Sequence, residues 1–86
     1  MEEQSWLDLF ITYLQLEKNR SVHTMKNYKN DITDFMRFME DLHIPSFTVV
    51  TVTDIHKYIA KLYENEYSGK TVARKVSALR SFYSFI

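Results

Sequence analysis

Residues 68–86, SGKTVARKVSALRSFYSFI, combine an apolar stripe and a polar stripe at the spacing of an α-helix. The apolar residues recur at intervals of three and four, which is the pattern of a helix that faces a core. No acidic residue occurs from position 67 to 86, so the polar side is purely cationic and hydroxylic. The segment therefore predicts a helix over 69–86 with one buried face and one face suited to an anionic partner. The apolar stripe is Val72, Val76, Leu79, Tyr83 and Ile86, and the polar stripe is Lys70, Arg74, Ser77 and Ser81.

The size and composition of the chain predict a single all-α domain over residues 1–86. Eighty-six residues suit one small domain, which needs a rich core at this size. Hydrophobic residues make up 45 % of the chain, and six Phe, six Tyr and one Trp supply bulk for that core. One Gly and one Pro leave little material for turns, which favours helices over a β architecture with many turns.

Several classes of protein are disfavoured by what the sequence lacks. It contains no cysteine, which excludes disulfide bonds and thiolate chemistry. No apolar run approaches the roughly 18 residues of a membrane span, and the acidic start MEEQSW is unlike a signal peptide. We therefore expect a cytoplasmic protein with no membrane partner.

Three further helices are predicted ahead of residue 68, over about 6–17, 22–42 and 54–66. Ser5 and Asp8 have the spacing of a capping box, Ser21 is a good N-cap for the second helix, and Thr53 is expected to cap the third. Residues 22–42 show the longest clean helical periodicity in the chain. Residues 43–53, HIPSFTVVTVT, are rich in strand-forming types, but a lone strand would have no pairing partner. We expect an extended loop there, held to the core by Ile44, Phe47, Val50 and Val52.

Charge is sorted along the sequence although the formal net charge is zero. Residues 20–29 contain three basic residues and residues 67–86 contain four, and neither segment contains an acid. These segments hold seven of the eleven basic residues. If they meet in space, they form one positive face on a neutral domain.

The helices predicted over 22–42 and 69–86 begin alike. Ser21 and Thr24 open the first, Ser68 and Thr71 open the second, and cations follow in the early turns. The first turn of a helix presents unpaired N–H groups and the positive end of the helix dipole, which favour a phosphate. Serine and threonine also cap helices that bind nothing, but here both caps lie in the acid-free segments. The small residues Ser77, Ala78 and Ser81 would let the last helix approach a groove wall closely.

No catalytic, metal or cofactor site is predicted, and no small-molecule ligand is expected. His23, His43 and His56 are too far apart in sequence and helical phase to suggest a metal site. Asp31 and Asp34 are interpreted as part of a charged face with no sign of a cleft.

The arrangement of these residues resembles the N-terminal core-binding domain of tyrosine site-specific recombinases and phage integrases, and most of all the Xer type. The resemblance covers essentially the whole chain and is most specific near its end. The matching motifs are Ser21-x-x-Thr24-x-x-x-Tyr28, Asp31-Ile32-x-x-Phe35-x-x-Phe38, Asp54-Ile55 with Tyr58-Ile59, Ser68-x-x-Thr71-Val72-x-Arg74, and Ser77-Ala78-Leu79-Arg80-Ser81-Phe82-Tyr83-x-Phe85.

The resemblance implies a four-helix SAM-like orthogonal bundle that binds duplex DNA. It also implies a parent enzyme that cleaves and rejoins DNA as a C-shaped clamp, with a catalytic domain that is not part of these 86 residues. The partners expected from it are double-stranded DNA and other recombinase protomers on that DNA, and it fits chromosome-dimer resolution and mobile-element integration alike. Arg80 is assigned to packing or to a salt bridge. The candidate DNA contacts on the second and fourth helices are Ser21, His23, Thr24, Lys26, Asn27, Asn30, Lys70, Thr71, Arg74, Lys75, Ser77 and Ser81.

The alternative hypothesis is a helical protein–protein interaction module that does not bind DNA. The apolar residues of 6–17 cover more than one stripe of that helix, which suggests a second contact surface. A free-standing enzyme is disfavoured because no constellation of catalytic residues is visible.

Overall fold

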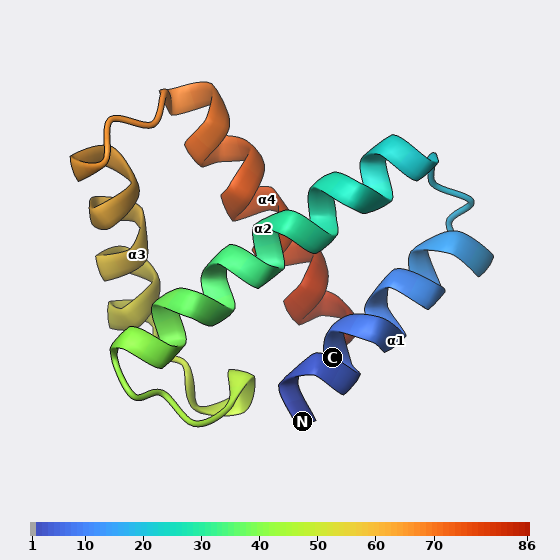
Figure 1. Ribbon diagram of the computed structural model, residues 1–86, viewed down its shortest axis with the longest axis horizontal. Helices are drawn as coiled ribbons and strands as arrows, with labels where there is room; N and C mark the ends of the chain where they lie inside the picture. Colours follow the sequence, from blue (N-terminus) through green and yellow to red (C-terminus); the bar gives the residue numbers. More distant parts are fainter. Residues whose placement is uncertain (1) are drawn as a thin grey trace.

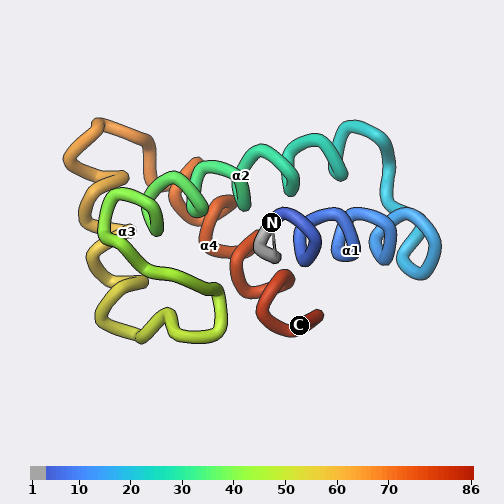
Figure 2. The backbone as a smooth tube through the Cα atoms, turned by 60° about the horizontal axis from the view of Figure 1, so that its bottom comes forward, coloured from blue at the N-terminus to red at the C-terminus, as the bar shows by residue number. Residues whose placement is uncertain are grey.

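A computed structural model describes residues 2–86, with side chains described from Gln4 onward. Within this range the chain forms α-helices joined by loops and contains no strand, so the predicted all-α, four-helix architecture is confirmed. Figure 1 shows α2 crossing α4 near the middle of the molecule, with α1 on one side and α3 on the other, and Figure 2 shows the same arrangement from a second direction. The elements are α1 (Glu2–Leu16), α2 (Val22–Asp41), the short 3₁₀-helix η1 (Phe47–Val49), α3 (Val52–Glu64) and α4 (Gly69–Phe85).

The core is built where the four helices and η1 meet, and aromatic rings fill much of it. Phe82 of α4 is completely buried and contacts rings from two other elements. Its ring centroid lies 5.3 Å from that of Phe10 on α1 and 4.6 Å from that of Phe47 on η1, both edge to face. On the other side of the crossing, Phe35 of α2 packs edge to face on Tyr58 of α3 at 5.0 Å. These contacts tie the outer helices to the crossing of α2 and α4.

Two of the predicted helix caps are confirmed. The Ser21 hydroxyl accepts a hydrogen bond from the Thr24 backbone N–H at 3.1 Å and donates to the Thr24 hydroxyl at 2.9 Å. Ser68 and Thr71 repeat both bonds at 3.2 Å at the start of α4. Each cap therefore satisfies one of the early N–H groups and fixes where its helix begins.

The other two predicted caps are wrong. Ser5 lies inside α1, which already begins at Glu2, so Ser5 and Asp8 do not form the predicted capping box. The cap of α3 is Thr51 rather than Thr53, because Asp54 is the third helical residue after Thr51 and can complete a capping box with it. The Asp54 N–H donates to the Thr51 hydroxyl at 3.1 Å, and the Thr51 N–H donates to the Asp54 carboxylate at 3.0 Å.

The buried face of α4 is rotated relative to the predicted stripe. Val72 and Leu79 are buried as expected, but Val76, Tyr83 and Ile86 are only partly buried. Lys75, Ala78 and Phe82 take their place, because α2 contacts α4 on the side where these three residues lie. Ala78 is completely buried, so it serves packing and not the close approach of a groove wall that its size suggested.

The connection between α2 and α3 is held to the core by η1. Phe47 is fully buried and Ile44 and Val50 are partly buried, as predicted, but Val52 is 72 % exposed because it starts α3. The Tyr83 hydroxyl donates a 2.8 Å hydrogen bond to the Phe47 carbonyl oxygen, which links α4 to the loop. Burial raises the pKa of Tyr83 to about 12.

Replacing Tyr83 with Phe is expected to lower the free energy of unfolding at pH 7 by about 1 kcal/mol, the usual net value of one hydrogen bond. Because the pKa of Tyr83 is raised on folding, its stabilising effect is complete below pH 10 and is lost as the pH rises from 10 to about 12. The free energy of unfolding of Tyr83→Phe should therefore fall less across that pH interval than the free energy of unfolding of wild type. Denaturant titrations at pH 7, 10 and 12 measure both effects. Tyr63→Phe, at an exposed tyrosine, is the control; equal stability of Tyr83→Phe and wild type at pH 7 contradicts the assignment.

Candidate nucleic-acid interface

The N-terminal halves of α2 and α4 diverge from their crossing and form a V whose two tips lie at the same edge of the molecule (Figure 1). A small cavity of about 160 Å³ lies between them. We call it the notch. Its lining residues are Thr24, Asn27, Tyr28 and Asp31 of α2 and Arg74 and Ser77 of α4. The first half of α2 and the middle of α4 therefore share this surface feature, whereas Ser68 and Thr71 at the start of α4 do not line it.

Four predicted contact residues meet in the notch and the others lie around it. Thr24, Asn27, Arg74 and Ser77 line it. Lys26 does not, because a helix turns 100° per residue and Lys26 lies 200° from Thr24 around α2. The remaining predicted contacts outside the notch are exposed (Ser21, His23, Lys26, Asn30 and Lys70), partly buried (Thr71 and Ser81) or buried (Lys75).

Asp31 is the centre of an ion-pair network at the base of the notch. Its carboxylate is 2 % exposed and accepts hydrogen bonds from Arg74 Nε at 3.2 Å and from Arg74 Nη2 at 3.0 Å. It also accepts a 3.1 Å bond from the Lys75 ammonium, which donates a second bond to Asp34 at 2.8 Å. Two carboxylates of α2 thus hold two cations of α4.

Lys75, one of the predicted DNA contacts, is buried inside the domain. Its side chain is 4 % exposed, and its ammonium is directed to Asp31 and Asp34. Burial alone lowers the pKa of Lys75, but the hydrogen bonds to Asp34 and Asp31 outweigh that effect and raise it. Lys75 therefore stays charged at neutral pH as part of the contact between the helices.

Arg74 differs from Lys75 because half of its side chain is exposed. Its two bonds to Asp31 use Nε and Nη2, which fixes the plane of the guanidinium. Nη1 makes no hydrogen bond within the described part of the chain. The Arg74 side chain is therefore held in one orientation beside Ser77 and can still donate to a ligand.

Sequence reasoning missed the role of Asp31 and Asp34. Thr24, Asn27, Asp31 and Asp34 follow one another at intervals of three, four and three, so they share one side of α2. That spacing could have shown that the two acids face the same neighbour as the notch residues. The interpretation of the two acids as part of a charged face without a cleft is wrong, because Asp31 is buried and lines the notch.

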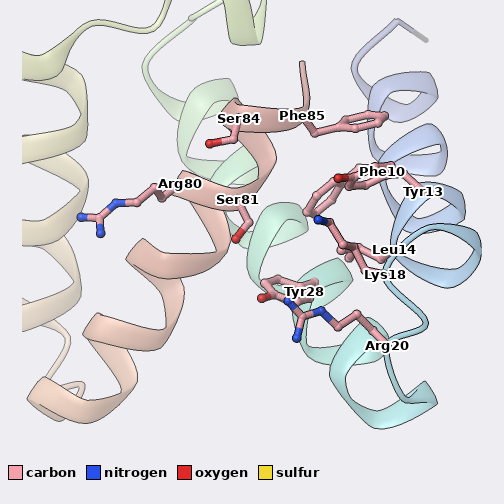
Figure 3. Close-up of a pocket in the computed structure, with 10 residues that line it drawn as sticks. All are labelled: Phe10, Tyr13, Leu14, Lys18, Arg20, Tyr28, Arg80, Ser81, Ser84 and Phe85. Atoms are coloured by element: carbon pink, nitrogen blue, oxygen red, sulfur yellow. The ribbon is translucent and has the colours of Figure 1, made fainter.

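A larger groove of about 340 Å³ lies beside the notch, between the end of α1, the start of α2 and the second half of α4 (Figure 3). Ser81, the predicted contact nearest to the C-terminal end of α4, lines this groove. Arg80 extends away from it in the view of Figure 3. Arg80 is nevertheless among the residues that line this groove, and it also lines a pocket with Ile55, Val76 and Tyr83; it forms no salt bridge within the described residues.

The described residues offer neither a metal site nor a membrane span. They contain no group of three or more His, Cys, Asp or Glu side chains placed to hold a metal ion. No helix among them is long and apolar enough to cross a membrane.

One family model matches nearly the whole length of the chain. Residues 7–86 match the family model described as phage integrase, N-terminal SAM-like domain. The chain therefore belongs to this family, as its resemblance to integrases and Xer-type recombinases suggested. No solved structure matches it significantly.

The similar curated proteins are recombinases of the Xer type. The chain is 45 % identical over 86 residues to the tyrosine recombinase XerC of Halalkalibacterium halodurans, a match that covers all of this chain and 28 % of that protein. It is 44 % identical over 80 residues to XerC of Anoxybacillus flavithermus, with 93 % of this chain and 27 % of that protein covered. It is 46 % identical over 77 residues to XerC of Listeria welshimeri, with 90 % and 26 % covered. The chain thus spans about a quarter of the length of these relatives.

Replacing Asp31 with Asn is expected to lower the free energy of unfolding by about 3 kcal/mol, because it removes one partner of a buried ion pair. Combining it with Lys75→Met should cost less than the sum of the two single changes, since the buried ammonium is then removed as well. Arg37→Gln breaks an exposed pair with Asp34 and should cost less than about 1 kcal/mol. Denaturant unfolding of the four variants measures these values. Additive effects of Asp31→Asn and Lys75→Met would show that the two groups do not interact.

Proposed function

We propose that this chain is the DNA-binding, core-binding domain of a tyrosine recombinase and that it clamps duplex DNA at a recombination half-site. The observation that supports this most is the notch, where polar side chains from the first half of α2 and the middle of α4 line one cavity. The membership of the SAM-like integrase family and the similarity to XerC proteins support the same function.

Each part of the interface has a distinct role in this proposal. The helix starts at Ser21 and Ser68 present backbone N–H groups and the positive ends of the helix dipoles to phosphates. Lys26 and Lys70 are exposed and form no ion pair within the described residues, so both are available to neutralise phosphates. Phosphate contacts of this kind position a protein on the duplex and supply most of its affinity.

The notch residues are suited to contacts in a groove of the DNA, between the phosphates of its two strands. Asn27 offers both a donor and an acceptor, and its position between Thr24 and Asp31 places it at the wall of the notch. Arg74 offers a donor in a fixed orientation, and Ser77 is small enough for a close approach. Groove-edge contacts of these types give sequence preference, whereas Lys26 and Lys70 give none.

The activity of the intact protein follows from the family and not from any group in this chain. In the proposal, DNA cleavage and rejoining belong to a separate catalytic domain, and this domain contributes no catalytic residue and needs no cofactor. The protein would act in the cytoplasm on chromosomal or mobile DNA, and both roles remain compatible with the interface.

A contact with a neighbouring protein is the second candidate function. Leu9 and Leu16 on α1 are 56 % and 73 % exposed, which leaves apolar surface outside the core. In Figure 1 the first half of α1 lies at the edge opposite the tips of the V, and only its end approaches the start of α2. A second protomer bound to the same DNA could therefore contact α1 while the notch remains on the duplex.

The salt dependence of duplex binding tests the proposal. If about four phosphates are neutralised, the logarithm of the association constant should fall with the logarithm of the salt concentration at a slope of about −3.6. Lys26→Gln combined with Lys70→Gln removes two of those contacts and should reduce the slope to about −1.8. Lys57→Gln, at an exposed lysine of α3, is the matched control and should leave the slope unchanged.

Fluorescence anisotropy of a labelled duplex at several salt concentrations gives the slopes. The dissociation constant of this single domain is expected in the range of about 10⁻⁴ to 10⁻⁶ M. A double variant with the wild-type slope, or a wild-type chain that binds no duplex at low salt, contradicts the proposal.

A further inference from the structure

The groove beside the notch has the composition of a site for a sugar–phosphate unit. Its volume of about 340 Å³ is roughly twice that of the notch, and no Asp or Glu is among its lining residues. Lys18 and Arg20 approach it from the connection between α1 and α2, and Ser81 and Ser84 approach it from α4. Phe85 supplies an apolar wall. Cations and hydroxyl groups bind phosphate oxygens, while an apolar wall suits the carbon atoms of a deoxyribose.

The two cations are directed to the groove and are not held by acidic partners. Neither Lys18 nor Arg20 forms an ion pair within residues 4–86. In Figure 3 the Arg20 side chain extends towards Tyr28, and the Lys18 ammonium lies on the groove side of α1. Lys18 Nζ also lies 5.9 Å from the ring centroid of Tyr13, which keeps its charge beside the opening.

The groove continues the notch along α4. Tyr28 lines both, and the α4 residues that line them, from Arg74 to Ser84, lie along one side of the helix. Ten residues of helix span about 15 Å at 1.5 Å per residue. This length corresponds to roughly four nucleotides of one DNA strand at 3.4 Å each. A strand whose phosphates meet the notch would therefore reach the groove within a few nucleotides.

We propose that Lys18 and Arg20 bind the DNA backbone in this groove, so that the interface extends from the notch to the end of α1. The inference rests on the proposed function and adds to it Lys18, which lies outside the acid-free segments, and Arg20, which belongs to residues 20–29 but is not among the predicted DNA contacts. Ser81 and Ser84 would donate to the same phosphate, and Phe85 would contact the adjoining sugar. In this arrangement the connection between α1 and α2 is a third part of the DNA interface, in addition to α2 and α4.

The test measures duplex binding by the 86-residue chain with Lys18→Gln and Arg20→Gln combined. The loss of two phosphate contacts should reduce the magnitude of the salt slope by about 1.8 relative to wild type. Ser84→Leu fills the groove without changing the charge and should also reduce the slope. Lys57→Gln controls for the loss of a distant surface charge. Circular dichroism and thermal unfolding of each variant confirm that it is folded.

Inorganic phosphate separates the DNA backbone from a free anion as the ligand. If the groove is a site for free anions, an amide NMR titration with inorganic phosphate should shift the resonances of Ser81 and Ser84 at millimolar concentration. The salt slope of duplex binding should then be the same for the combined Lys18→Gln and Arg20→Gln variant as for wild type. That result overturns the inference. The inference is also overturned if the Lys18/Arg20 variant and Ser84→Leu both keep the wild-type salt slope while Lys26→Gln combined with Lys70→Gln still reduces the magnitude of that slope. If no variant and no wild-type chain binds the duplex, the proposed function itself fails.

Discussion

The hydrogen bonds that Asp31 accepts from Arg74 and Lys75 fix how α2 and α4 lie against each other. A buried charge without a partner costs several kcal/mol, because it loses its hydration without compensation. A rotation of α4 about its axis would take Lys75 away from Asp31 and Asp34. The network therefore permits one orientation of α4, and this orientation turns Arg74 and Ser77 to the notch and Ser81 to the adjoining groove.

The same network lowers the charge of the surface that it organises. Two acids of α2 lie beside two of the four cations of α4, so the notch is less positive than the acid-free segments suggested. The polar groups that remain are helix N-termini, hydroxyls, one amide and one oriented guanidinium. Binding by a surface of this kind releases few counterions, so general attraction to polyanions contributes little to the affinity. The fit of the surface to a groove of the DNA then contributes more. It also agrees with a domain whose formal net charge is zero.

Much of the fold follows from local patterns in the sequence, because helix periodicity and serine caps depend on residues close together in the chain. The starts of α2 and α4 at Ser21 and Ser68 are examples. The ion pairs between α2 and α4 could not be predicted, because their partners lie more than 40 positions apart in the chain. Lys75 belongs to an exposed cationic segment by sequence, yet Asp31, 44 positions earlier, draws it into the core. The interpretation of Thr53 as a cap failed for a local reason, since Thr51 also has a carboxylate three residues on. In the site, Thr24 and Arg74 line the same notch, whereas Lys26, which lies about 200° from Thr24 around α2, does not.

The most direct test of this interface is an amide NMR titration of the ¹⁵N-labelled chain with a short DNA duplex. If the starts of α2 and α4 bind the duplex together, the largest shift changes should occur in residues 21–30 and 68–81, with Asn27 and Ser77 affected at the same duplex concentration. Shift changes confined to α1, or to only one of the two helix starts, would contradict the claim that the crossing at Asp31 builds a single DNA-binding surface.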